Sequence, residues 1–127
     1  MGYTVVELTT RAQLKELREQ RRDFVIKATA SWCRPCKAIQ PLVLSLMARL
    51  PRSPLLVIVD VNRGPDLSSF LKIKAVPAFF SYINGEPMFS YLGCDVQGVR
   101  SFFGKTAAKM GGCLPVLAEG LEEEDDN

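Results

Sequence analysis

The residues of this sequence best suited to carry chemistry are two cysteines, Cys33 and Cys36, which are separated by two residues. They stand between an apolar segment at 24–26, which predicts a buried strand, and a segment with the apolar spacing of a helix. Two intervening residues allow both sulfurs to bond within the first helical turn, where free N–H groups stabilise a thiolate. We therefore expect Cys33 to attack a substrate disulfide and the shielded Cys36 to release the reduced substrate by attacking Cys33.

A pair of this spacing is also half of a zinc site, so metal binding is the alternative. The other two cysteines, Cys94 and Cys113, are 19 residues apart and form no second pair of the same spacing. The sequence contains no histidine, which excludes Cys–His and Ser–His nucleophile pairs and the zinc sites that use imidazole. We predict dithiol exchange, with no metal and no cofactor.

The elements that position the pair follow from apolar periodicity and turn signals, and they predict the order β-α-β-α-β-α-β-β-α. The alternating strands and helices of the first two thirds predict a sheet with helices on both faces. The last two strands form a hairpin around Asn84-Gly85, so the sheet is expected to be mixed. Pro41 is expected to kink the second helix, and Pro51 and Pro54 to end it. Strands are expected at 4–8, 23–30, 55–59, 78–83 and 87–92, and helices at 11–20, 36–50, 66–71 and 96–110.

Composition and charge narrow the setting of this chemistry. The chain has 127 residues, of which 47 % are apolar and 24 % are charged, which is typical of one globular domain. We expect this domain at 1–112 and an acidic, flexible tail at 113–127. Without a bilayer-length apolar run or a signal peptide, we expect a cytoplasmic protein with no membrane partner. The basic residues are scattered and not interleaved with aromatic residues, so nucleic acid is not an expected partner.

The segment Trp32-Cys33-Arg34-Pro35-Cys36-Lys37 resembles the active site of the thioredoxin family, which is usually Trp-Cys-Gly-Pro-Cys-Lys. The resemblance extends over about residues 4 to 110. Its further motifs are Pro41 in the active-site helix, Val59-Asp60-Val61-Asn62 after the central strand, Ala75-Val76-Pro77, the Asn84-Gly85 turn and Gly93.

The resemblance implies an α/β thioredoxin-like fold, a mixed sheet of about five strands flanked by about four helices. It implies an enzyme: a monomeric disulfide reductase that acts on disulfide-containing proteins and is recycled by a flavoprotein of the thioredoxin reductase type. It also implies a cis peptide bond before Pro77 and a substrate groove formed by Trp32, Arg34, Pro35, Val76, Pro77 and Gly93. A binding module with an incidental dithiol, or an oxidase or isomerase of the same fold, are the alternatives.

Two residues depart from the family pattern. Arg34 replaces the usual glycine; it either favours the Cys33 thiolate or is simply solvated. Lys27 stands where the family usually has a buried aspartate, and the position that often carries the lysine partner of this aspartate is identified as Leu56. Lys27 either lies under Cys36 with a lowered pKa, as a proton acceptor or a cation, or extends its amine to solvent.

Cys94 follows Gly93 at the edge of the expected groove. It is a regulatory thiol, a site for a disulfide-linked dimer, or a small apolar side chain that fills space. Cys113 belongs to the expected tail.

Overall fold

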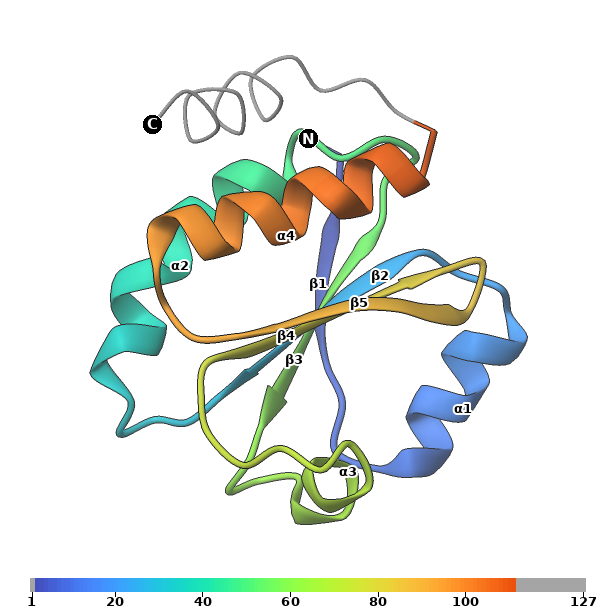
Figure 1. The fold of residues 1–127 in the computed structure, drawn as a ribbon. Coiled ribbons are helices and arrows are strands. Elements are labelled where there is room, and N and C mark those ends of the chain that lie inside the picture. The colour runs from blue at the N-terminus through green and yellow to red at the C-terminus, as the bar shows by residue number, and fades with distance from the viewer. Residues whose placement is uncertain (1, 112–127) are drawn as a thin grey trace.

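A five-stranded mixed sheet forms the centre of the molecule, in the order β1-β3-β2-β4-β5 (Figure 1). The computed structural model describes residues 2–111. Strands β1, β3 and β2 are parallel, whereas β4 is antiparallel to β2 and β5 is antiparallel to β4. The strands are β1 (Thr4–Glu7), β2 (Phe24–Thr29), β3 (Leu55–Asp60), β4 (Ala78–Ile83) and β5 (Glu86–Leu92).

Four helices cover the sheet, two on each face (Figure 1). The helices are α1 (Arg11–Glu19), α2 (Arg34–Met47), α3 (Pro65–Phe70) and α4 (Val96–Lys109). Helices α2 and α4 lie on one face, and α1 and α3 lie on the other. The expected element order is confirmed. Thr10 caps α1 through the backbone N–H of Gln13, and Asp95 caps α4 through that of Gly98.

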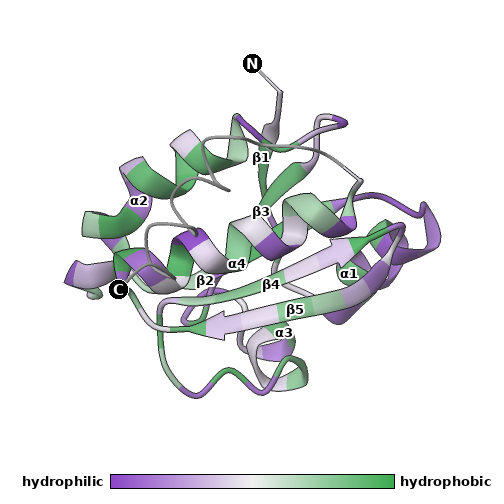
Figure 2. Ribbon diagram, turned by 45° about the horizontal axis from the view of Figure 1, so that its top comes forward, coloured by the Kyte–Doolittle hydropathy of each residue, from purple (hydrophilic) through white to green (hydrophobic). Residues whose placement is uncertain are grey.

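The alternation of side chains along the inner strands creates two apolar cores. On β2, Val25 packs with residues of α2 and α4, whereas Phe24 and Ile26 pack with residues of α1 and α3. Strand β3 is buried on both faces, as its continuous apolar run predicts, while the edge strand β5 is mostly exposed. Figure 2 shows the same contrast, with the visible part of β3 coloured hydrophobic and β5 mostly pale.

Helix α2 ends at Met47, three residues earlier than its apolar spacing predicts. The backbone of Arg49 and Leu50 continues in tighter turns, bonded to the carbonyls of Leu46 and Met47. Leu50 is buried in the same core as the helix, so its burial extends the apolar pattern beyond the helical backbone. Pro41 lies inside α2, as expected.

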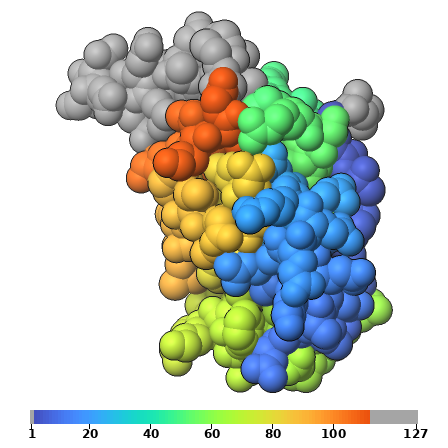
Figure 3. Space-filling model, turned by 90° about the vertical axis from the view of Figure 1, so that its right-hand side faces the viewer, coloured from blue at the N-terminus to red at the C-terminus, as the bar shows by residue number. Residues whose placement is uncertain are grey.

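The segment after α2 also ties the end of α4 to the sheet. Arg52 forms an ion pair of 2.9 Å with Asp23 and donates a hydrogen bond of 2.6 Å to the carbonyl oxygen of Met110. In Figure 3 the end of α4, in orange-red, lies directly beside this green segment. The expected tail at 113–127, including Cys113, lies outside the described residues. Within residues 2–111, no helix has both the length and the apolar character needed to span a bilayer.

Candidate active site

The two cysteines lie where β2 passes into α2. Cys33 is the N-cap of this helix, and its Sγ accepts a hydrogen bond of 3.2 Å from the backbone N–H of Cys36. Pro35 lies in the first turn, where its missing N–H costs no helical hydrogen bond. Cys33 and Cys36 are joined as a disulfide, with their Cα atoms 5.3 Å apart. The expected position of the pair at a helix N-terminus is confirmed.

The cysteines differ in accessibility, but less than expected. Cys36 has no exposed surface, and Cys33 retains 4 %. Val61 and Val76 pack against the pair, which explains why so little of Cys33 is open. Its Sγ lies 3.9 Å from the carbonyl oxygen of Val76. Any attack on or by the pair from solvent therefore reaches Cys33 first.

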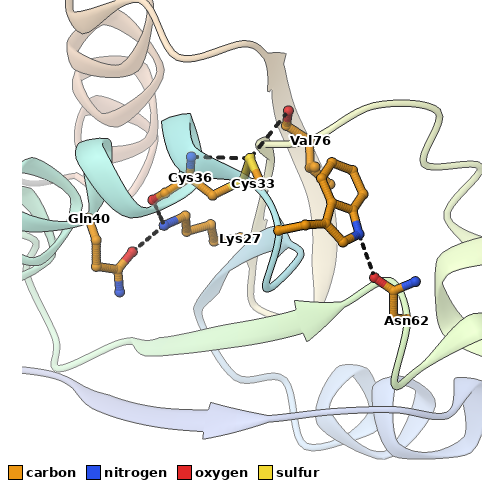
Figure 4. Close-up of a disulfide and its surroundings, with 7 residues drawn as sticks. Lys27, Cys33, Cys36, Gln40, Asn62 and Val76 are labelled. Atoms are coloured by element: carbon orange, nitrogen blue, oxygen red, sulfur yellow. Dashed lines mark hydrogen bonds between the residues drawn. A yellow bond between two sulfur atoms is a disulfide. The ribbon is translucent and has the colours of Figure 1, made fainter.

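Trp32 forms one wall beside the pair. Its side chain is 68 % exposed, and its indole N–H donates a hydrogen bond of 2.9 Å to Oδ1 of Asn62 (Figure 4). Asn62 is held in turn by Asp60, whose Oδ1 accepts a 2.9 Å hydrogen bond from the Asn62 backbone. The sequence placed Asn62 in the segment after the central strand but gave no signal that it orients Trp32.

A second part of the site comes from the segments before β4 and after β5. The Val76–Pro77 peptide bond is cis, as the resemblance implied. The backbone N–H of Gly93 donates a hydrogen bond of 3.0 Å to the carbonyl oxygen of Pro77, which ties the two segments together. Gly93 has a φ of +138°, a conformation that favours glycine, and a Cβ there would lie 3.0 Å from the hydroxyl of Tyr91.

Arg34 and Pro35 begin α2 and are both exposed beside Cys33. No ion pair within residues 2–111 includes Arg34. Within that range there is also no cluster of three or more cysteine or carboxylate side chains that could hold a metal.

Lys27 lies on the inner side of the disulfide. The residue is only 3 % exposed, and its Nζ donates a hydrogen bond of 2.7 Å to the carbonyl oxygen of Cys36 and another to Oε1 of Gln40 (Figure 4). Burial lowers the pKa of Lys27 from 10.5 to about 8. The interpretation in which its amine extends to solvent is therefore wrong. Gln40 was not predicted, although its spacing of four from Cys36 places both on one face of the helix.

The identification of Leu56 as the strand position beside Lys27 is also wrong. In the parallel register of β2 and β3, Leu56 pairs with Val25, and the neighbour of Lys27 is Ile58. Leu56 itself is fully buried in the apolar core under α2 and α4. Counting along one strand could not fix this register, because it depends on how two strands pair.

Cys94 is exposed, so the interpretation of this residue as a filler of apolar space is wrong. It lies in the turn between β5 and α4, next to the N-cap residue Asp95. A regulatory or dimer-forming role of Cys94 stays a prediction.

Comparisons with known proteins agree with this fold. The thioredoxin family profile matches residues 4–103. The chain is 29 % identical to an H-type thioredoxin of Chlamydomonas reinhardtii over 112 residues, which cover 85 % of this chain and 99 % of that protein. It is 34 % identical to thioredoxin H9 of Arabidopsis thaliana over 98 residues, covering 74 % and 69 % of the two chains.

Solved structures show the same fold. The structure of the reduced Schistosoma mansoni thioredoxin pre-protein aligns with a TM-score of 0.70 at 30 % identity, covering 81 % of this chain and 98 % of that one. The oxidised mitochondrial thioredoxin 3 of Saccharomyces cerevisiae aligns with a TM-score of 0.72 at 26 % identity, covering 80 % and 94 %. With the dithiol at the start of α2 and these matches along most of its length, the chain belongs to the thioredoxin family and is a protein thiol–disulfide oxidoreductase.

Proposed function

We propose that this oxidoreductase works as a reductase of protein disulfides, with Cys33 as the nucleophile and Cys36 as the resolving thiol. The observation that carries the proposal is the disulfide at the N-terminus of α2, in which only Cys33 keeps exposed surface. The helix N-terminus and the Cys36 N–H stabilise negative charge on the Cys33 sulfur. A thiolate at this position is both reachable and reactive.

The reaction consists of two exchanges that conserve electrons. The Cys33 thiolate attacks one sulfur of the substrate disulfide, forms a mixed disulfide, and expels the other substrate sulfur as a thiolate. The Cys36 thiol then loses its proton, and its thiolate attacks the Cys33 sulfur. This second step forms the Cys33–Cys36 disulfide and expels the remaining substrate sulfur as a thiolate. The substrate gains two electrons, and the dithiol loses two.

The walls around Cys33 suit an extended polypeptide. Trp32 offers a broad apolar surface. The carbonyl oxygen of Val76 lies 3.9 Å from the Cys33 sulfur, so the Val76 backbone can form hydrogen bonds to a substrate strand beside that sulfur. Pro77 and Gly93 close the same side. We infer recognition by shape and a few backbone hydrogen bonds, which suits a range of disulfide-containing proteins. Arg34 and Pro35 border this groove at the start of α2.

The oxidised dithiol must be reduced again by a two-electron donor. We propose a flavoprotein of the thioredoxin reductase type as this donor, with the chain acting as a monomeric electron carrier in cytoplasmic redox homeostasis. The family membership supports this assignment, and the alternative of a binding module with an incidental dithiol gains no support from the comparisons.

Insulin-disulfide reduction with dithiothreitol as electron source tests the proposal. We expect the wild-type protein to accelerate reduction and Cys33→Ser to fall to the uncatalysed rate. Cys94→Ser, which changes an exposed thiol outside the pair, serves as the matched control and retains activity. A wild-type protein that binds insulin but does not accelerate its reduction would contradict the reductase assignment.

A further inference from the structure

Lys27 is a buried cation beside the resolving cysteine, and the two-step scheme above gives it no role. None of the ion pairs within residues 2–111 includes Lys27. Its two hydrogen-bond acceptors, the Cys36 carbonyl and the Gln40 amide oxygen, are both neutral. A buried charge with only neutral partners is costly, so its presence calls for an anion that forms during the reaction.

The surroundings of Lys27 supply no such anion in the disulfide state. Its strand neighbours are Ile58 on β3 and Phe79 on β4, which are both apolar. A pocket with a volume of about 220 Å³ lies at Lys27. Its other lining residues are Thr29, Cys36, Lys37, Gln40 and Ile58. The other charged side chain of this lining is Lys37, which has the same sign.

Cys36 is therefore the group of this pocket that can become an anion. Asp60 ends β3 beside Thr29, but its carboxylate accepts hydrogen bonds from the backbone of Asn62 and Arg63. Cys36 lines the pocket together with Lys27, and its carbonyl oxygen is 2.7 Å from Nζ. Reduction of the disulfide leaves its sulfur free to ionise.

We propose that Lys27 is a positioning residue that supplies the positive charge for the Cys36 thiolate, and that Gln40 fixes its amine under the first turn of α2. The proposal rests on the proposed function, since it concerns the resolving step. In that step the Cys36 proton passes to solvent, the thiolate attacks Cys33, and the substrate sulfur leaves as a thiolate. Lys27 keeps its proton throughout and lowers the free energy of the attacking anion.

The protonation state of Lys27 sets the pH range of this effect. With a pKa of about 8, its amine is mostly an ammonium at pH 7 and mostly neutral well above pH 8. The stabilisation of the Cys36 thiolate is therefore present near neutral pH and is lost as the pH rises. Because the two groups interact, they titrate as a coupled pair.

The test measures the Cys36 thiolate directly, in a protein in which it is the only thiol. The background combines Cys33→Ser, Cys94→Ser and Cys113→Ser, and ultraviolet thiolate absorbance is followed against pH. We expect Lys27→Met to raise the Cys36 pKa by about 1 or more, and Lys27→Arg to keep it low. Lys37→Met removes an exposed lysine of the same pocket, and we expect a shift below about 0.3.

Two further measurements separate this effect from a loss of structure. Gln40→Leu keeps the charge but removes one of its acceptors, so we expect a smaller rise of the Cys36 pKa. In the otherwise wild-type protein, Lys27→Met slows release of the mixed disulfide about tenfold at pH 7 and less than about twofold near pH 10. The first attack by Cys33 is unchanged.

An unchanged or lower Cys36 pKa in Lys27→Met would overturn the proposal, as would an equal shift in Lys37→Met. The absorbance titration needs no substrate, so its outcome is independent of the reductase assignment. If insulin is not reduced, the proposed function fails. If insulin is reduced and the thiolate titration is unaffected by Lys27, only the role of Lys27 fails.

Discussion

The two sides of the disulfide differ in what they offer a reacting sulfur. On the outer side, Cys33 faces an exposed indole and a backbone carbonyl. On the inner side, Cys36 lines a pocket that contains the buried amine of Lys27 and the side-chain amide of Gln40. Figure 4 shows Lys27 and Gln40 on one side of the cysteines and Val76 and Asn62 on the other. We therefore expect substrate access and resolution to depend on different kinds of contact.

The comparison also separates what this chain shares with its family from what it changes. The outer side keeps the tryptophan, the first cysteine and the proline of the family motif, at Trp32, Cys33 and Pro35. On the inner side, the resemblance to the family places Lys27 where a buried aspartate is usual, which would reverse the sign of the buried charge. Shape recognition and charge are carried by different residues, so one can change without the other.

The largest effect is expected on the outer side. Cys33→Ser removes the thiol of the only residue of the pair that keeps exposed surface, and a hydroxyl does not ionise near neutral pH. We expect a loss of at least about 1,000-fold in the rate of disulfide reduction, because Cys36, the remaining thiol of the pair, is fully buried. Stopped-flow kinetics with a protein disulfide measure this loss, and substantial residual turnover would place the nucleophile elsewhere.

On the inner side, we expect the buried amine of Lys27 to make the unfolding free energy depend on pH. Between about pH 8 and 10.5 the folded state leaves Lys27 neutral while the unfolded state keeps it protonated, so the unfolding free energy rises with pH. This rise corresponds to about 3 kcal/mol in the wild-type protein and is absent in Lys27→Met. The variant should therefore be more stable by about 1–3 kcal/mol at pH 7, and this advantage should shrink towards pH 10.

Urea unfolding of the oxidised wild-type and Lys27→Met proteins at several pH values measures the difference, since other titrating groups cancel between them. Lys37→Met, at an exposed lysine of the same pocket, provides the control without a pH-dependent difference. Parallel stability curves for wild type and Lys27→Met would contradict the buried charge.

A smaller effect is expected from the outer wall. Trp32→Ala removes the exposed indole, and we expect kcat/KM for a protein disulfide to fall about fivefold to tenfold. A small synthetic disulfide, which cannot reach along the groove, should change by less than about twofold. Asn62→Ala removes only the hydrogen bond that orients Trp32 and should cost about threefold. Equal losses for both substrates would mean that Trp32 acts on the thiol rather than on the bound chain.

The smallest effect is expected at Arg34, which is exposed beside Cys33. We expect Arg34→Gly to lower the reduction potential by about 10–20 mV, because it removes an exposed cation beside Cys33 and a nearby cation favours the reduced thiolate. Equilibration of both proteins with glutathione measures this difference. A rise in potential would show that Arg34 stabilises the disulfide instead.

Local patterns in the sequence predicted the frame of this molecule well. Periodicity and turn residues predicted the order of the elements and the position of the dithiol at the start of a helix. The continuous apolar run of β3 agrees with its burial. The end of α2 was not predicted, because Leu50 is buried without being part of the regular helix. The apolar spacing therefore marked which residues are buried, but it did not mark where the helical hydrogen bonding of α2 ends.

The residues around the site were harder to predict, because they depend on contacts between distant segments. The pairing of Ile58 with Lys27 is a matter of strand register, and the bond from Trp32 to Asn62 spans 30 residues of sequence. Cysteine is a residue type that is usually buried, yet the position of Cys94 in the turn between β5 and α4 leaves it exposed.

The order of attack by the two cysteines is the central claim, and trapping with Cys36→Ser tests it most directly. This variant keeps Cys33, so it should form a mixed disulfide with a protein substrate and fail to release it. Peptide mapping by mass spectrometry, in a background that also carries Cys94→Ser and Cys113→Ser, identifies the linked residue. The account predicts a stable adduct at Cys33 that only added dithiothreitol releases. Normal turnover by Cys36→Ser would contradict the account. So would a stable substrate adduct at Cys36 in the converse variant, Cys33→Ser.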